Sequence, residues 1–228
     1  MAQSQDGRQA SWSEVVVVCL ALLAALGVEG LVVLLFPHLK TDSWVLGVAL
    51  EVVAYALIAT VVVVALHRIP ETVRSMLGAA AAPVTRQALV AVASAAGAFL
   101  LVVGVPCLFG VPLTDITGTS NGSVAKLIVD VAFFLIVVGP IEELCFRGYL
   151  FGRLRQLVRP SFAVVIQAVL FGLWHIPTHP NLASIGLVTV VGLLFGFVRW
   201  KVPAATILAL GVAHGLYDAT LAVLAAVV

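Results

Sequence analysis

Three short patterns in the second half of the chain place acidic and basic side chains one helical turn apart. They are Glu142-Glu143 followed by Arg147, Phe171 followed by His175, and His214 followed by Asp218. Carboxylates and imidazoles are the side chains that most often move protons in catalysis. Each pattern lies in or beside an apolar run, where an ionisable residue costs about 2.5–3.5 kcal/mol on insertion scales. Such residues therefore call for a structural or functional reason.

In the first pattern, two adjacent acidic side chains point to different faces of the helix. Glu143 and Arg147 are four residues apart with the acid first, which is the favourable orientation for an ion pair on one helix face. Glu142 points about 100° away and is left for another task. Neighbouring carboxylates in different environments can take different roles, one as a base and one as an anchor. The alternative is an ion pair at a helix end near the membrane interface.

The other two patterns have structural and functional interpretations of their own. Phe171 and His175 share a helix face, and Gly172 allows a close helix contact; taken alone, this histidine is an interfacial hydrogen-bonding residue. His214 and Asp218 form either a hydrogen-bonded pair that links helices, or an imidazole that a carboxylate holds in one tautomer. Catalytic and metal-bound histidines are commonly held in the second way.

Composition shows which elements must position these residues. Of the 228 residues, 62% are hydrophobic and 10% are charged, and the mean hydropathy is +1.19. Soluble domains contain about a quarter charged residues. We therefore predict an all-α, polytopic transmembrane helical bundle. The net charge of +1 gives no basic footprint for nucleic acid, and Cys19, Cys107 and Cys145 are interpreted as small hydrophobic residues.

Apolar runs long enough to cross a bilayer predict about seven spans. They lie near 15–36, 44–66, 87–109, 124–145, 161–177, 182–199 and 203–226. We expect a polar N-terminal tail at 1–14 and a single transmembrane helical domain at 15–228, with the catalytic core at 124–226.

The basic residues orient the predicted bundle, because Lys and Arg collect on the cytoplasmic side. With seven spans, ten of the twelve basic residues fall in loops on the same side of the membrane as the N-terminus. Only Lys40 and Lys126 fall on the opposite side. The ten are Arg8, Arg68, Arg74, Arg86, Arg147, Arg153, Arg155, Arg159, Arg199 and Lys201. The sequence therefore predicts a cytoplasmic N-terminus and an external C-terminus.

Depth in the membrane brings the three patterns together. If the fourth helix continues to about Val158, Glu142 lies ~24 Å above its cytoplasmic end. His175 lies ~22 Å above the start of its helix, and His214 lies ~16 Å above the start of its own. We therefore expect one shared site. Glu29 and Glu51 fall in the same layer and could pair, line the same cavity or bond to backbone.

The three motifs in this order resemble the CAAX protease and bacteriocin-processing (CPBP) family of intramembrane endopeptidases, which includes the type II CAAX prenyl endopeptidases. The resemblance covers roughly residues 125–225. It implies that Glu142 activates a water which His175 also holds, and that Glu143 and Arg147 orient Glu142. Phe171 completes the second motif. His214 and Asp218 would stabilise the oxyanion; prenyl endopeptidases have Asn at the last position, and Asp218 can donate only if protonated.

The resemblance also bears on cofactors, partners and location. Zinc could be held by Glu142, His175, His214 and Asp218, but there is no His-Glu-x-x-His helix and the family can work without metal, so we expect no cofactor. We expect contact with membrane lipid, a peptide or protein substrate (C-terminal processing being one option), and a multi-pass location in a bacterial plasma membrane. The alternatives are a proton-coupled membrane transporter and a catalytically silent scaffold or immunity protein.

Overall fold

A computed structural model describes residues 10–36, 43–67, 82–120, 122–176 and 181–228. Within these ranges the chain is helical and contains no β-strand. Six helices are long and apolar enough to cross a membrane: Trp12–Val32, Trp44–His67, Val84–Leu108, Val124–Leu157, Leu182–Lys201 and Ile207–Val227. The prediction of an all-α membrane bundle is therefore confirmed. The seventh predicted span, 161–177, is a shorter apolar helix, Pro160–Trp174.

The elements follow the chain in a simple order. They are α1 (Trp12–Leu35), α3 (Trp44–His67), α5 (Val84–Phe99), the π-helical η1 (Leu100–Gly104), α6 (Val105–Leu108), α7 (Leu113–Thr117) and α8 (Val124–Phe133). The π-helical η2 (Phe134–Val138), α9 (Gly139–Glu143), the π-helical η3 (Leu144–Leu150), α10 (Phe151–Leu157), α11 (Pro160–Trp174), α12 (Leu182–Lys201) and α13 (Ile207–Val227) complete the chain.

Several of these helices are capped at their N-terminus by a side-chain hydroxyl or amide oxygen. Ser123, Asn181 and Thr206 precede α8, α12 and α13, and each accepts a hydrogen bond from a backbone N–H in the first turn. Such caps satisfy amide groups that have no partner inside the helix. Pro160 begins α11, where its missing N–H costs nothing.

The fourth span is one helical rod of 34 residues from Val124 to Leu157. The expected continuation to about Val158 is confirmed. Two π-helical segments, η2 and η3, flank α9 within this rod, and π-helical turns often occur at functional sites. Arg147 was counted among the basic loop residues, and that assignment is wrong. It lies inside the rod and is 1% exposed, because buried groups meet its guanidinium.

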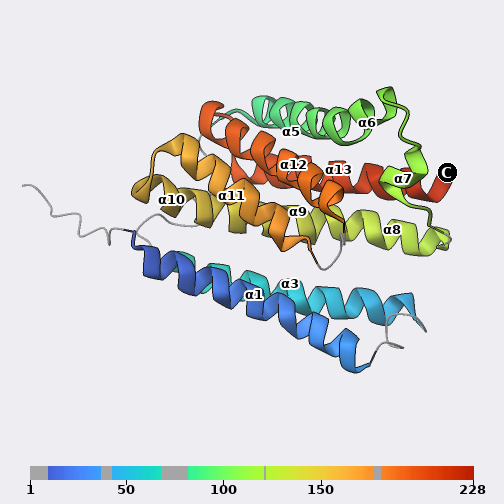
Figure 1. Ribbon diagram of the computed structural model, residues 1–228, viewed down its shortest axis with the longest axis horizontal. Helices are drawn as coiled ribbons and strands as arrows, with labels where there is room; N and C mark the ends of the chain where they lie inside the picture. Colours follow the sequence, from blue (N-terminus) through green and yellow to red (C-terminus); the bar gives the residue numbers. More distant parts are fainter. Residues whose placement is uncertain (1–9, 37–42, 68–81, 121, 177–180) are drawn as a thin grey trace, which may run out of the picture.

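The helices form two parts around the fourth span (Figure 1). Helices α1 and α3 lie side by side below the rod, whereas α11, α12, α13 and α5 lie above it. Figure 1 also shows the start of α1 and the C-terminus at opposite ends of the bundle.

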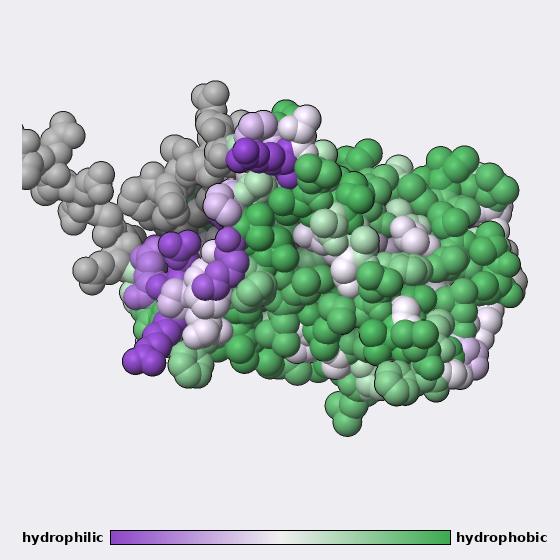
Figure 2. Space-filling view, turned by 90° about the horizontal axis from the view of Figure 1, so that it is seen from above, coloured by the Kyte–Doolittle hydropathy of each residue, from purple (hydrophilic) through white to green (hydrophobic). Residues whose placement is uncertain are grey.

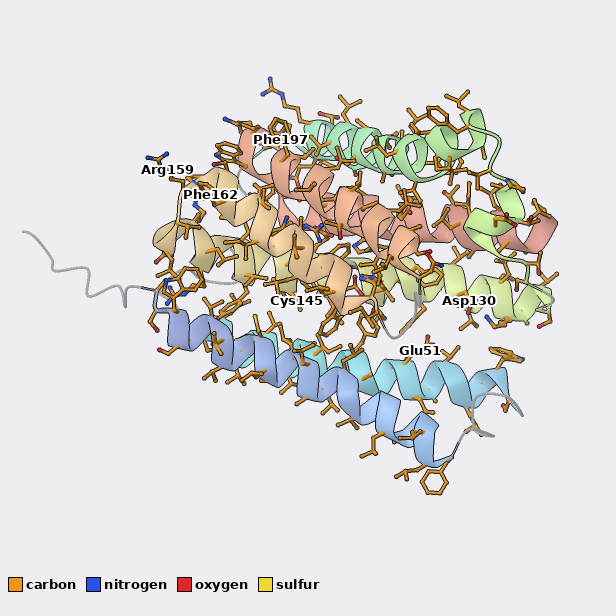
Figure 3. All side chains as sticks on the ribbon, viewed as in Figure 1. Glu51, Asp130, Cys145, Arg159, Phe162 and Phe197 are labelled. Carbon is orange, nitrogen blue, oxygen red and sulfur yellow. The ribbon has the colours of Figure 1, made fainter. Side chains whose placement is uncertain are left out.

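The surface has the apolar character that a bilayer demands. Figure 2 shows a hydrophobic surface over most of the bundle and hydrophilic residues gathered at one end. Arg159 lies at that end, and Asp130 lies toward the other (Figure 3). Arg8, Lys40, Arg68 and Arg74 lie outside the described residues. The chain is a multi-pass integral membrane protein, and its orientation stays a prediction from its basic residues.

Candidate active site

A contact between glycines sets the distance between the fourth span and α13. A Cβ on Gly139 would lie 2.4 Å from the carbonyl oxygen of Gly211 and 2.7 Å from the nitrogen of Gly215. A Cβ on Gly215 would lie 2.6 Å from the carbonyl oxygen of Phe134. The two backbones meet because none of these positions has a side chain. His214, next to Gly215, is thereby brought against α9.

Glu143 is the buried anchor of the site. Its Oε1 accepts hydrogen bonds from the Arg147 guanidinium at 2.9 Å and from Nδ1 of His214 at 2.9 Å. Arg147 also donates to the carbonyl oxygen of Gly192 in α12 at 3.3 Å. Both charged side chains of the Glu143–Arg147 pair are 0% exposed. The pair therefore lies inside the protein and is no interfacial ion pair.

The Phe171 ring packs against three functional side chains. The Arg147 guanidinium carbon lies 4.3 Å from the ring centroid, within the range of a cation–π contact. The imidazole rings of His175 and His214 lie edge-on, with centroids 4.7 and 5.7 Å away. Phe171 and His175 thus share a helix face as predicted. An aromatic ring at this position fixes the spacing of the two histidines.

The two carboxylate oxygens of Glu142 have different surroundings. Oε1 accepts a hydrogen bond from the Tyr55 hydroxyl at 2.5 Å. Oε2 is buried and has no hydrogen bond within the described part of the chain. It faces Nε2 of His175 at 3.7 Å and Nε2 of His214 at 3.8 Å. These separations exceed a direct hydrogen bond, so neither imidazole satisfies Oε2 directly.

His175 lies where α11 ends, and its ring orientation has a clear cause. Its Nδ1 is 2.8 Å from the carbonyl oxygen of Phe171. Because a carbonyl oxygen only accepts hydrogen bonds, this contact favours a proton on Nδ1. In the neutral ring, Nε2 is then an acceptor that faces Glu142. Pro177, which follows in the sequence, lies outside the described residues.

Carboxylates lie at both nitrogens of His214. Nδ1 contacts Glu143, and Nε2 lies 3.3 Å from Oδ2 of Asp218 one turn along α13. Since ionised carboxylates only accept hydrogen bonds, each contact is best met when the facing nitrogen carries a proton. The sequence had offered Asp218 as the partner of this histidine, and the structure adds Glu143 at a shorter distance.

These residues line a partly open cavity of about 440 Å³. Its wall includes the carboxylates of Glu142 and Asp218 and both histidines, so the structure brings the four predicted catalytic residues to one space. Glu51 also lines the cavity, from the side of α3 that faces the rod (Figure 3). The side chain of Glu29 lies outside the described residues.

Sequence reasoning missed Tyr55. It lies four residues after Glu51 in an apolar span, so its spacing from an intramembrane acid was available as a signal. Its partner, Glu142, is 87 residues away in the chain. Local spacing does not show which face of α3 meets α9.

The carboxylates and imidazoles of the site are of the types that bind zinc. Within the described ranges, no group of three or more His, Cys, Asp or Glu side chains is arranged to hold a metal ion. The mechanism proposed for these residues uses their side chains alone. Metal-free function stays a prediction.

Comparison with known proteins agrees with the motifs. A family model described as type II CAAX prenyl endopeptidase Rce1-like matches residues 124–220, which is less than half of the chain. No curated protein and no solved structure matches the sequence significantly. The matched segment contains every residue of the three motifs, and the family indicates intramembrane protease activity. Residues 124–220 of this chain thus carry the Rce1-like signature, consistent with the CPBP family that the motifs resemble.

Proposed function

We propose that this protein is an intramembrane endopeptidase in which Glu142 activates a water molecule. The observation that carries the proposal is Oε2 of Glu142, a buried carboxylate oxygen without a direct hydrogen bond from the described residues that lies 3.7 and 3.8 Å from two imidazole nitrogens on the wall of the cavity. A general base needs a reactive oxygen within reach of the proton that it removes. Tyr55 occupies the other oxygen of Glu142 and so orients this one toward the cavity.

The geometry supports a division of roles between the two histidines. A water between Glu142 and His175 would donate one proton toward Oε2 and the other toward Nε2 of His175. The lone pairs of the water oxygen would then be free to attack the substrate carbonyl carbon. His214, with a proton on Nε2, would donate to the oxygen that becomes negative. Losing one comparable donor costs about 10²–10³ in rate.

The reaction balances without another reagent. Glu142 takes a proton from the water as the water oxygen bonds to the carbonyl carbon. The oxyanion then collapses, the C–N bond breaks, and Glu142 returns the proton to the leaving nitrogen. The products are a carboxyl terminus and an amino terminus. Glu143 and Arg147 act as positioning residues because they hold His214 and the interior of the rod.

The test compares protein termini in membranes from cells that produce the wild type, Glu142→Gln, His175→Ala or Asp130→Asn. Asp130 is the matched acid control, since it pairs with Lys126 on α8 and does not line the cavity. We expect new peptide termini with the wild type and the control, and none with the first two variants. Wild-type levels of these termini in Glu142→Gln would remove the assigned base. A cellular phenotype lost without any Glu142-dependent cleavage would favour transport or a silent scaffold.

A further inference from the structure

The cavity extends from the site toward one end of the bundle only. On α13 its wall continues past His214 through Asp218 and Ala222 to Ala225. On the fourth span it continues from Glu142 back through Val138 to Phe133, which is toward the start of α8. These two helices run in opposite directions, so both sets of lining residues lie on the same side of the site.

The other helices agree with this direction. Helix α12 contributes Val188 and Val191 from its first half, and α3 contributes Glu51 and Tyr55 from its first half. Helix α11 contributes only its last residues, and Thr117 adds the end of the short helix α7 between α6 and α8. By the predicted orientation, each of these positions lies between the site and the extracytoplasmic end.

On the opposite side of the site, Phe146, Leu150 and Leu210 are at most 5% exposed and do not line this cavity. Phe146 and Leu150 line a separate apolar pocket of about 140 Å³ against α1. Exposure rises in the other direction. The Glu142 and His214 side chains are 3% and 4% exposed, whereas Asp218 is 21% exposed. Solvent access thus increases from Glu142 toward the C-terminal end of α13.

We infer that the peptide bond enters from the extracytoplasmic side, and that the substrate is the juxtamembrane segment of a protein anchored in the same membrane. The inference rests on the proposed function for naming the occupant a substrate. The basic residues orient the bundle, and the lining of the cavity extends from the site toward the predicted extracytoplasmic end. Apolar walls such as Phe133 and Trp174 suit a chain already beside lipid.

Depth adds a requirement on the substrate. His214 lies 13 residues before the end of α13, or ~20 Å below the extracytoplasmic end at 1.5 Å per residue. An extended chain advances ~3.3–3.6 Å per residue, so about six residues must extend into the cavity. The cleaved segment should therefore be free of stable helix over that length.

Accessibility of single cysteines tests the direction without any substrate. In a background with Cys19, Cys107 and Cys145 replaced by Ala, we would label Ala222→Cys and Val188→Cys with a membrane-impermeant maleimide. Val223→Cys is the matched control, at the depth of Ala222 but on the exposed outer face of α13. Gln156→Cys, exposed on α10, reports the predicted cytoplasmic end.

In intact cells, both cavity cysteines should react about tenfold faster than Val223→Cys, because a thiol reacts as its thiolate in water rather than in lipid. Gln156→Cys should react only after the membrane is permeabilised. Cavity cysteines that react only from the cytoplasmic side, or no faster than Val223→Cys, would overturn the inference. Two cavity positions on different helices guard against one variant that fails to fold.

A pair of single-span reporters tests the substrate class. Each carries the same randomised segment of 15 residues, placed beside the span on the extracytoplasmic or on the cytoplasmic flank. Cleavage that needs Glu142 should occur in the extracytoplasmic library, and cleavage confined to the cytoplasmic library would contradict the inference. If neither library is cut, the proposed function fails while the labelling still decides the direction of the cavity.

Discussion

The Tyr55 hydroxyl lies 2.5 Å from Oε1 of Glu142 and donates a hydrogen bond to it across two packed helices. The contact links α3, which packs against α1, to the centre of the site. It also makes the two oxygens of Glu142 unequal, since one is occupied and the other faces the imidazoles. Tyr55 is therefore a positioning residue that acts through Glu142.

Tyr55→Phe removes this hydroxyl and keeps the ring, which packs edge-on against Phe133. A hydrogen bond to a charged group contributes about 1.5–3 kcal/mol, so kcat should fall about 10–100-fold. Tyr217→Phe is the control, because Tyr217 also lines the cavity and has no hydrogen bond to Glu142. An equal fall in kcat in both variants, or a change in KM without a fall in kcat, would contradict the positioning role.

Much of the site could be predicted because its motifs obey helical spacing. One turn along a helix places Phe171 beside His175, and alternate crossings bring Glu142 and His214 to similar depths. No local pattern shows how α3 is rotated about its own axis, so the contact of Tyr55 with Glu142 could not be predicted. The contact of Gly139 with Gly211 escaped for the same reason, since partners across helices are set by packing of the whole bundle.

The boundaries were less predictable than the motifs. The continuation of the fourth helix to about Val158 was predicted, but Arg147 was placed among the basic loop residues because an arginine usually marks a membrane boundary. In the structure Arg147 lies inside the protein, since Glu143 and the carbonyl oxygen of Gly192 meet its guanidinium. A pairing between distant helices thus overrode a reliable local rule.

Asp218→Asn distinguishes the two roles of the last motif residue. The Asn amide oxygen can still accept a hydrogen bond from Nε2 of His214, but it carries no charge. If Asp218 orients His214 as a carboxylate, kcat should fall about tenfold in Asp218→Asn and about 10²-fold in Asp218→Ala. The rate at which purified membranes of each variant cleave one reporter segment that the wild type cuts provides the measurement. A rate in Asp218→Asn at or above the wild type would instead identify this position as an oxyanion donor.

Arg147→Met should strongly destabilise the protein. The substitution leaves the Glu143 carboxylate fully buried without its guanidinium partner, and breaking such a pair costs about 3–5 kcal/mol. Adding Glu143→Gln removes the unpaired charge and should recover part of the loss. The free energy of unfolding, obtained by denaturant titration of the detergent-solubilised protein, measures both effects.

The control for this pair is Arg155→Met, which removes an exposed arginine from the same rod. It should change the free energy of unfolding by less than about 0.5 kcal/mol. The double variant should remain inactive, because Nδ1 of His214 loses its carboxylate partner. Recovery of activity together with stability would show that Glu143 serves the fold alone.

Gly215→Ala tests whether close backbone contact positions His214. The new Cβ would lie 2.6 Å from the carbonyl oxygen of Phe134 and 2.7 Å from Cα of Leu135. Both are backbone atoms, so α13 must shift away from the fourth span. Overpacking of this kind costs about 1–3 kcal/mol, and a shift of His214 by a fraction of an ångström should lower kcat more than tenfold.

Gly186→Ala is the matched substitution in α12, because a Cβ there meets no atom within 4 Å. It should leave kcat unchanged and stabilise the helix by up to about 1 kcal/mol, the difference in helix propensity between the two residues. The comparison separates a local clash from the general effect of replacing glycine. If Gly215→Ala kept full activity, the glycine contact would set the helix spacing without setting the position of His214 relative to Glu142.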